Sequence, residues 1–95
     1  MERRLRVLMF RGVNHWLAQG LELDICAQGP TRDIVLARFR RTLRAEIFIR
    51  FQEAAEPIKP APQRFFAEYE KAPKYCQLVV TYDVAVRMVM LEVPS

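Results

Sequence analysis

The sequence predicts a single α+β domain, in which a small antiparallel sheet of three N-terminal strands carries one main helix. Apolar and polar residues alternate over much of 3–29, a pattern typical of strands with one buried face. From Thr31 onward the apolar residues recur at helical spacing, until the proline-rich segment 56–62. Because 95 residues suffice for only one core and 52% of them are hydrophobic, we expect one globular domain over 1–95.

Three short strands are expected before the helix. The first covers 3–10, where apolar side chains alternate with Arg4 and Arg6, so its early outer face should be exposed to solvent. The second covers 15–23 and follows a turn, which makes the pair a hairpin. The third covers 24–29 and ends at a Gly-Pro pair that forces another turn.

The main helix is expected to begin at Thr31, because its hydroxyl can accept a hydrogen bond from an unpaired amide one turn ahead. It should end by about Glu56, before the prolines. One stripe should pack on the sheet, whereas the arginines at 38, 41 and 44 fall on the opposite face. The stripe consists of Leu36, Phe39, Leu43 and Ile47, flanked by Val35 and Thr42. After Ile47 the helix is apolar nearly all round, so we expect another segment or a second subunit to cover its last turns.

The remaining chain predicts a proline-rich loop, a short helix and one or two strands. Prolines exclude a helix from 57–62, and 63–72 then favours a short helix with its aromatic side chains on the core. Residues 75–93 are rich in β-branched and aromatic residues, and either one long bent strand or two strands fits them. An exposed strand edge is a template for pairing with a target or with an identical chain, so a homo-oligomer is one expectation.

Positive charge is concentrated in the first half of the chain. The formal net charge is +4 at pH 7, and arginine dominates up to residue 50, whereas the remainder is close to neutral. An anionic partner, whether nucleic acid or acidic protein, should therefore meet the first half.

No segment predicts a membrane span or a secretion signal. A span needs about 20 apolar residues, and the apolar run at 7–10 is far too short for a signal peptide. We therefore expect a cytoplasmic protein without a membrane partner. In that reducing compartment Cys26 and Cys76 are expected to be buried free thiols, and their spacing fits no zinc motif.

Several of these features, in this order, resemble the HicB family of antitoxins. The resemblance covers roughly the first two thirds of the chain and is strongest over 1–62, with 63–95 as a strand-rich extension. It is carried by Trp16 and Ala18 in the second strand, by "LELDICAQGPT" at 21–31, by the helical stripe of Leu36, Phe39, Leu43 and Ile47, and by "EPIKPAP" at 56–62.

The resemblance implies a partly degraded ribonuclease H-like fold within a toxin–antitoxin system. Antitoxins of this family bind the small RNA-cleaving toxin HicA and block its active surface. This sequence departs from the family in two ways. It shows no C-terminal DNA-binding segment, so binding of an operator by this chain alone is not expected. After Thr31 it carries Arg32 and Ile34 beside Asp33, where the family tends to have acidic residues.

No catalytic site is expected. A ribonuclease H-type site needs carboxylates that converge on two metal ions, usually with one Asp in the first strand, and 3–10 contains none. The scattered acids are Glu22, Asp24, Asp33, Glu46 and Asp83, which we expect in turns, in a cap and on solvated faces. No nucleophile or carboxylate stands at a spacing from His15 that would indicate a catalytic pair, so we expect His15 to face solvent. The sequence thus predicts a protein that is not an enzyme and uses no metal or cofactor.

The candidate partner-binding residues are arginines. They are Arg38, Arg41 and Arg44 on the outer helix face, with Arg4 and Arg6 beside them. The expected function is an antitoxin-like inhibitor that occludes a nuclease, with a HicA-type toxin as its first candidate partner. Two alternatives stay open: a stand-alone module that inhibits another nuclease machine, such as a CRISPR effector, and a small basic nucleic-acid-binding protein.

The arginine-bearing helix face itself has three interpretations: it binds an acidic protein, it binds nucleic acid, or it is only solvated. Proteins that read single-stranded nucleic acid interleave basic residues with exposed aromatic ones. This helix places Phe39 on its buried stripe instead. Trp16 also has two interpretations, an exposed binding anchor or a structural position in the hairpin.

Overall fold

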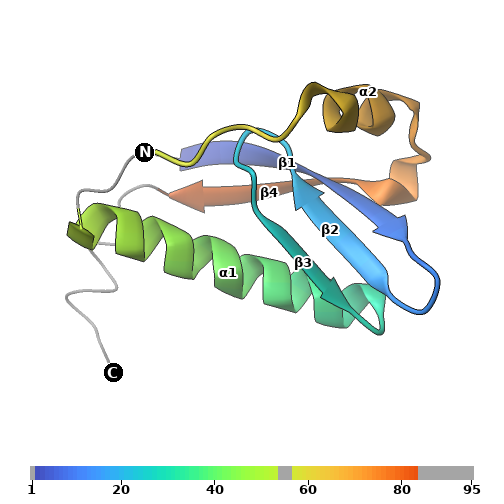
Figure 1. The fold of residues 1–95 in the computed structure, drawn as a ribbon, viewed down its shortest axis with the longest axis horizontal. Helices are drawn as coiled ribbons and strands as arrows, with labels where there is room; N and C mark the ends of the chain where they lie inside the picture. The colour runs from blue at the N-terminus through green and yellow to red at the C-terminus, as the bar shows by residue number, and fades with distance from the viewer. Residues whose placement is uncertain (1, 54–56, 84–95) are drawn as a thin grey trace.

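Four antiparallel strands and two helices form the described part of this chain, residues 2–53 and 57–83 of a computed structural model (Figure 1). The expected α+β architecture, with a helix packed on the sheet, is confirmed. The strands are ordered β3–β2–β1–β4, and every neighbouring pair is antiparallel. The bounds are Glu2–Arg11 for β1, Trp16–Gly20 for β2, Cys26–Gly29 for β3, Arg32–Glu53 for α1, Gln63–Lys71 for α2, Lys74–Cys76 for the 3-10 turn η1 and Gln77–Asp83 for β4.

The C-terminal strand belongs to the same sheet as the N-terminal strands. β4 pairs along most of β1, from Glu2 opposite Asp83 to Leu8 opposite Gln77. β1 therefore lies inside the sheet, and the three-stranded sheet expected from the sequence is a four-stranded one. The rest of the strand-rich segment, 84–95, lies outside the described residues, so the choice between one and two C-terminal strands stays open.

β1 separates two layers of side chains. Leu5 and Val7 are fully buried in the core beneath α1, whereas Leu8 is buried on the side of α2. Consecutive strand residues point to opposite faces, so Arg4 and Arg6 lie on the same side as Leu8. The expectation that this side is open to solvent is wrong at Arg6, which is half-buried because α2 packs against this face.

The main helix α1 begins one residue after Thr31, which caps it as the sequence predicts. The backbone N–H of Ile34 donates to Thr31 Oγ1 over 3.2 Å. The helix extends to Glu53, before the prolines, and 54–56 lie outside the described residues. Ile49 near its end is 44% exposed. The cover that we expected for this end, another segment or a second subunit, stays a prediction.

α1 packs across β2 and β3 through an apolar stripe. Val35 and Phe39 are fully buried, and Leu43 is nearly so. Leu36 and Ile47 pack against the same core but are only partly buried. The buried face of the helix is therefore rotated toward Val35, relative to the stripe expected from the sequence.

The short helix α2 covers the opposite face of the sheet, as Figure 1 shows, and builds a second apolar cluster there. Leu8, Leu21 and Tyr69 are buried in this cluster, and Phe65 and Phe66 pack beside them. The short helix that we expected here, with its aromatic side chains in apolar surroundings, is confirmed. Its aromatic side chains do not join the core beneath α1, however, because β1 lies between the two layers.

The proline-rich segment 57–62 packs along the chain that leads out of β2. The Ala61 N–H donates to the Leu21 carbonyl oxygen over 2.8 Å, and the Asp24 N–H donates to that of Lys59 over 2.7 Å. These bonds fix the path by which the chain returns from α1 to α2 on the other face.

β2 ends at Gly20, earlier than the Leu23 expected from the sequence, because the chain bends sharply there. The Gly20 N–H donates to the Ile25 carbonyl oxygen over 2.8 Å. A Cβ at Gly20 would come within 2.6 Å of the Leu23 carbonyl oxygen, so only glycine fits this bend without a backbone shift.

Both described cysteines are free, but only Cys76 is buried. Cys26 is exposed, so the expectation of two buried thiols is wrong for this residue. Its side chain points away from α1, which covers only the other face of β3. Within the described residues, no helix has the length and apolar character needed to cross a membrane.

Candidate functional site

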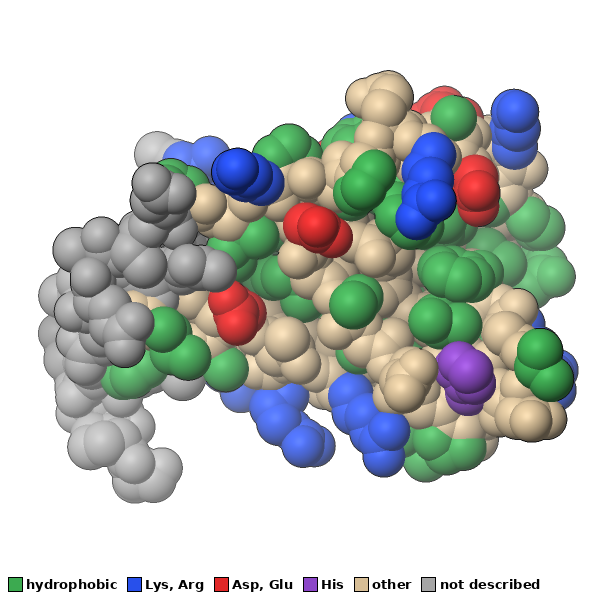
Figure 2. Space-filling model, viewed as in Figure 1, with side chains coloured by type: hydrophobic (Ala, Val, Ile, Leu, Met, Phe, Trp, Pro, Cys, Tyr) green, Lys and Arg blue, Asp and Glu red, His purple; other side chains and the backbone are tan. Residues whose placement is uncertain are grey.

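Among the arginines of α1 whose side chains are described, four are exposed, and we call them the arginine face: Arg38, Arg40, Arg41 and Arg44. They project from the side of the helix that does not pack on the sheet. In Figure 2 basic side chains line the edge of the molecule that α1 forms. Three of the five candidate residues therefore lie together, and the structure adds Arg40 to them.

The arginine face is largely without intramolecular partners. The Arg38 guanidinium donates through Nη1 to the Gln28 carbonyl oxygen over 2.9 Å. The side chains of Arg40, Arg41 and Arg44 make no ion pair or hydrogen bond with any residue in 2–53 or 57–83. Their charge is therefore available to a partner, and the packed opposite face of α1 holds their Cα atoms in fixed positions.

The other two candidates, Arg4 and Arg6, do not lie beside the arginine face. They point from β1 toward the layer of α2, whereas α1 packs on the opposite face of the sheet. Arg4 is exposed, and Arg6 is half-buried. The five candidate arginines therefore belong to two separate surfaces.

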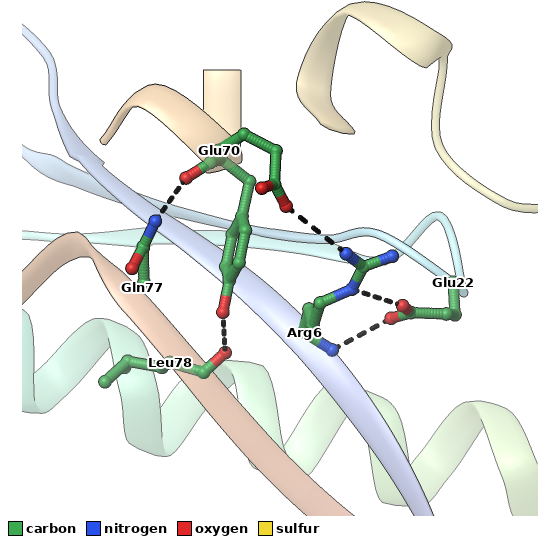
Figure 3. Close-up of polar contacts among 6 residues, drawn as sticks. Arg6, Glu22, Glu70, Gln77 and Leu78 are labelled. Carbon is green, nitrogen blue, oxygen red and sulfur yellow. Dashed lines mark hydrogen bonds and ion pairs between the residues drawn. The ribbon is translucent and has the colours of Figure 1, made fainter. Parts of the chain in front are cut away.

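Arg6 is held by a carboxylate in the β2–β3 loop and by charged and aromatic side chains of α2 (Figure 3). Its Nε donates to Glu22 Oε2 over 2.6 Å, and its backbone N–H donates to Glu22 Oε1 over 2.9 Å. Nη1 lies 3.7 Å from Glu70 Oε2. The guanidinium carbon stands 5.3 Å from the ring centre of Phe66 and 5.7 Å from that of Tyr69. Arg6 thus joins β1 to α2, and its charge is already paired within the chain.

Tyr69 completes the link between α2 and the sheet. Its hydroxyl donates to the Leu78 carbonyl oxygen over 3.3 Å, and Gln77 Nε2 donates to the Tyr69 carbonyl oxygen over 2.6 Å (Figure 3). Partial burial is the main cause that raises the pKa of the Tyr69 phenol, and the nearby carboxylates of Glu22 and Glu70 add to it. The phenol therefore stays protonated and continues to donate at neutral pH.

Glu22 is an ion-pair partner whose environment favours its charged form. Partial burial by itself raises the pKa of this carboxyl group. The hydrogen bonds from the backbone and guanidinium of Arg6 together outweigh burial, so the pKa is lowered from its ordinary value of 4.5. The folded state therefore binds the Glu22 proton less tightly than the unfolded chain does.

This difference predicts an acid-dependent loss of stability that Glu22→Gln removes. A carboxyl group with a lowered pKa stabilises the fold above its unfolded pKa, and that contribution is lost as the pH falls through the folded pKa. At pH 7 we expect Glu22→Gln to reduce the free energy of unfolding by about 1 kcal/mol, a modest value because both side chains are more than one third exposed. The difference between variant and wild type should shrink as the pH falls below 4.5, the ordinary pKa of this group.

Urea unfolding followed by circular dichroism at pH 7, 5, 4 and 3 measures this dependence. Glu68→Gln is the matched control, because Glu68 is exposed on α2 and forms no ion pair within the described residues. A constant difference between Glu22→Gln and wild type across all four pH values would contradict the assignment.

A second basic surface lies at the end of the sheet where the β1–β2 turn, the start of α1 and η1 meet. We call it the basic–aromatic end, and it consists of Arg11, Trp16, Arg32, Lys74 and Tyr75. Arg11 and Trp16 are paired across β1 and β2. The guanidinium carbons of Arg11 and Arg32 each lie over the Trp16 ring, 5.9 Å from its centre. Tyr75 is 64% exposed.

Arg32 connects three of the segments at this end. Its Nη2 donates to the Tyr75 carbonyl oxygen, and its guanidinium lies over Trp16. Its Nε is buried and has no hydrogen-bond partner within the described residues. Trp16 itself packs against the core beneath α1 and is half-buried. The structural interpretation of Trp16 is therefore supported, whereas its role as a binding anchor stays a prediction.

Sequence reasoning does not identify Arg32, Lys74 and Tyr75 as site residues. In the sequence, Arg32 is notable only because a basic residue stands where an acidic first turn is usual. It lies three residues before the buried Val35, however, and this spacing directs its side chain toward the sheet. The position of Tyr75 depends on the pairing of β4 with β1, which no local pattern specifies. That Trp16 and Tyr75 both contact Arg32 could not be inferred from one sequence.

The remaining polar candidates do not gather around a single point. Asp24 accepts a hydrogen bond from Gln19 Nε2 over 2.8 Å, and Asp33 lies in the first turn of α1. His15 was expected to face solvent but is half-buried in the β1–β2 turn. In the two described ranges no three His, Cys, Asp or Glu side chains come together as a metal site would require.

No protein-family model, curated protein or solved structure matches this chain.

Proposed function

We propose that this protein is a stoichiometric inhibitor, which binds an acidic surface of a nuclease through the arginine face of α1. The observation that carries the proposal is the set of three exposed guanidinium groups, Arg40, Arg41 and Arg44, without partners in the described part of the chain. Arginine is enriched at binding hot spots, and its planar fork binds carboxylates through two parallel hydrogen bonds.

The position of α1 suits recognition of a folded partner. One face of the helix is anchored by Val35, Phe39 and Leu43, so little backbone freedom is lost when the other face binds. No aromatic side chain stands among the arginines on this face up to Arg44. Charge without stacking surface favours a protein that carries carboxylates over a single-stranded nucleic acid.

A nuclease as the target is suggested by the resemblance to the HicB antitoxins. The resemblance depends on an order of three strands, a capped helix, a proline-rich segment and a further strand, and the chain has these elements in that order with α2 inserted before the last strand. A HicA-type RNA-cleaving toxin is therefore the first partner to test. The surface that it presents to α1 must carry carboxylates, and a larger nuclease machine such as a CRISPR effector is the second target class.

Coexpression with a HicA-type toxin in bacteria tests this proposal through growth. Wild-type chain should restore colony formation, and Arg41→Glu should lower it at least tenfold, because it places a carboxylate against an acidic partner surface. Arg4→Glu is the matched control, since Arg4 is exposed on the other side of the sheet, and it should rescue growth as wild type does. Growth arrest with the wild-type chain, or equal rescue by both variants, would overturn the proposal for this toxin.

A further inference from the structure

We propose that the basic–aromatic end is a binding site for single-stranded nucleic acid, separate from the arginine face and independent of the proposed inhibitor function. Four segments distant in sequence converge there: the end of β1, the start of β2, the first turn of α1 and the turn η1. Strand pairing and the hydrogen bond from Arg32 to Tyr75 hold these segments in place before any ligand arrives.

The charge of this surface suits a phosphate backbone. Arg11, Arg32 and Lys74 contribute three cations, and the four segments contain one carboxylate within the described residues, that of Asp33. Neither Arg11 nor Arg32 forms an ion pair in 2–53 or 57–83. Cations that are not neutralised within the chain are free to replace the counterions of a nucleic acid.

The aromatic residues of the basic–aromatic end provide a stacking surface, which the arginine face does not have. Trp16 supports the guanidinium groups of Arg11 and Arg32 by cation–π contact, which keeps both cations beside one aromatic ring. Tyr75 is 64% exposed while its carbonyl oxygen is held by Arg32. An exposed ring fixed by its backbone is a platform on which an unpaired base can stack.

Arg32 also carries a donor that the chain does not satisfy. Its Nη2 bonds to Tyr75, but its Nε is buried without an acceptor among the described residues. A buried donor on a charged group is costly unless it finds a partner. A phosphate or base oxygen seated beside Tyr75 offers such an acceptor after a small rotation of the Arg32 side chain.

Nucleic acid fits this surface better than an acidic protein does. An acidic peptide would neutralise the cations but make no specific use of the exposed Tyr75 ring. Single strands use cations and rings together, and stacking on one aromatic side chain contributes about 1–3 kcal/mol per base. A duplex would keep its bases stacked on each other, so it could not use Tyr75 in the same way.

Fluorescence anisotropy with labelled 12-mers of uridine and of deoxythymidine tests the site at 50 and 200 mM NaCl. Tyr75→Ala should weaken binding at least fivefold, and Tyr75→Phe should restore it because the ring, not the hydroxyl, stacks. Arg11→Glu should weaken binding at least tenfold and reduce the dependence on salt. The matched control Arg41→Glu makes the same charge change on the arginine face and should alter the affinity less than threefold.

Three results would overturn the proposal. One is the absence of binding to either 12-mer at 50 mM NaCl. Another is an equal loss in Arg11→Glu and Arg41→Glu with none in Tyr75→Ala, which would mean diffuse attraction by net charge. The third is binding of polyglutamate that competes with the 12-mers and depends equally on Tyr75, which would assign the surface to an acidic protein. RNA and DNA share the chemistry proposed here, so preference for one 12-mer supports the site and identifies its natural ligand class.

Discussion

Phe39→Ala should lower the free energy of unfolding by about 3–5 kcal/mol, because it empties the centre of the core beneath α1. Phe39 is fully buried there between the helix and the sheet. Its ring fills the space next to Gly20, where an added Cβ would lie 3.2 Å from Cζ. A domain of this size is stabilised by only about 5–14 kcal/mol, so this single change removes a large part of the total.

Thermal and urea unfolding measured by circular dichroism test this expectation. The midpoint temperature should fall by at least about 12 °C in Phe39→Ala. Phe39→Leu should lose much less, because it keeps most of the buried volume. Ile34→Ala is the control on the same helix, since Ile34 is 40% exposed, and it should change stability only slightly. A loss below about 1 kcal/mol in Phe39→Ala would contradict the packing of α1 on the sheet.

Arg41→Glu/Arg44→Glu should weaken binding of a HicA-type nuclease at least 100-fold at low salt, with little effect on stability. Neither side chain has a polar partner within the described residues, so its replacement breaks no ion pair or hydrogen bond there. In a complex, each change exchanges an attraction for a repulsion between like charges, which costs several kcal/mol when the groups are close. A loss of 100-fold corresponds to about 2.8 kcal/mol, well within that range.

Isothermal titration with a catalytically inactive nuclease measures this loss. Arg4→Glu/Arg64→Glu is the control, because it makes the same change in net charge at two exposed positions on the side of α2. The control should bind as wild type does, and the wild-type affinity should itself fall as salt is raised. Equal weakening by both double variants would mean that net charge, and not the arginine face, determines the affinity.

Local patterns in the sequence predicted the elements that depend on neighbouring residues. Alternation identified the first three strands, and the hydroxyl of Thr31 correctly placed the start of α1. The prolines after residue 56 correctly separated α1 from α2. These features depend on side-chain period and backbone chemistry, which a single sequence contains.

The arrangement of the layers was less predictable, because it depends on pairing between distant residues. β4 could have joined either edge of a three-stranded sheet, and α2 could have packed on either face. The face that α2 covers places Phe66 and Tyr69 over Arg6, which the alternation alone assigned to solvent. Charged side chains at strand positions are therefore poor guides to exposure when a later helix packs over them.

The candidate site shows the same division. Exposure of Arg38, Arg41 and Arg44 could be deduced from their angle relative to the buried stripe of one helix. The separate location of Arg4 and Arg6 could not be deduced, because it depends on which face of the sheet α1 packs against. The basic–aromatic end could likewise not be predicted from residue spacing, since its members come from four separate segments.

Titration of a HicA-type nuclease with this chain in an RNA-cleavage assay tests the central claim most directly. The proposal predicts that cleavage falls to background near molar equivalence, and that the Arg41→Glu/Arg44→Glu variant fails to inhibit at the same concentration. Uninterrupted cleavage at a large excess of wild-type chain would contradict inhibition of this nuclease. Full inhibition by the double variant would contradict the assignment of the arginine face as the surface that binds it.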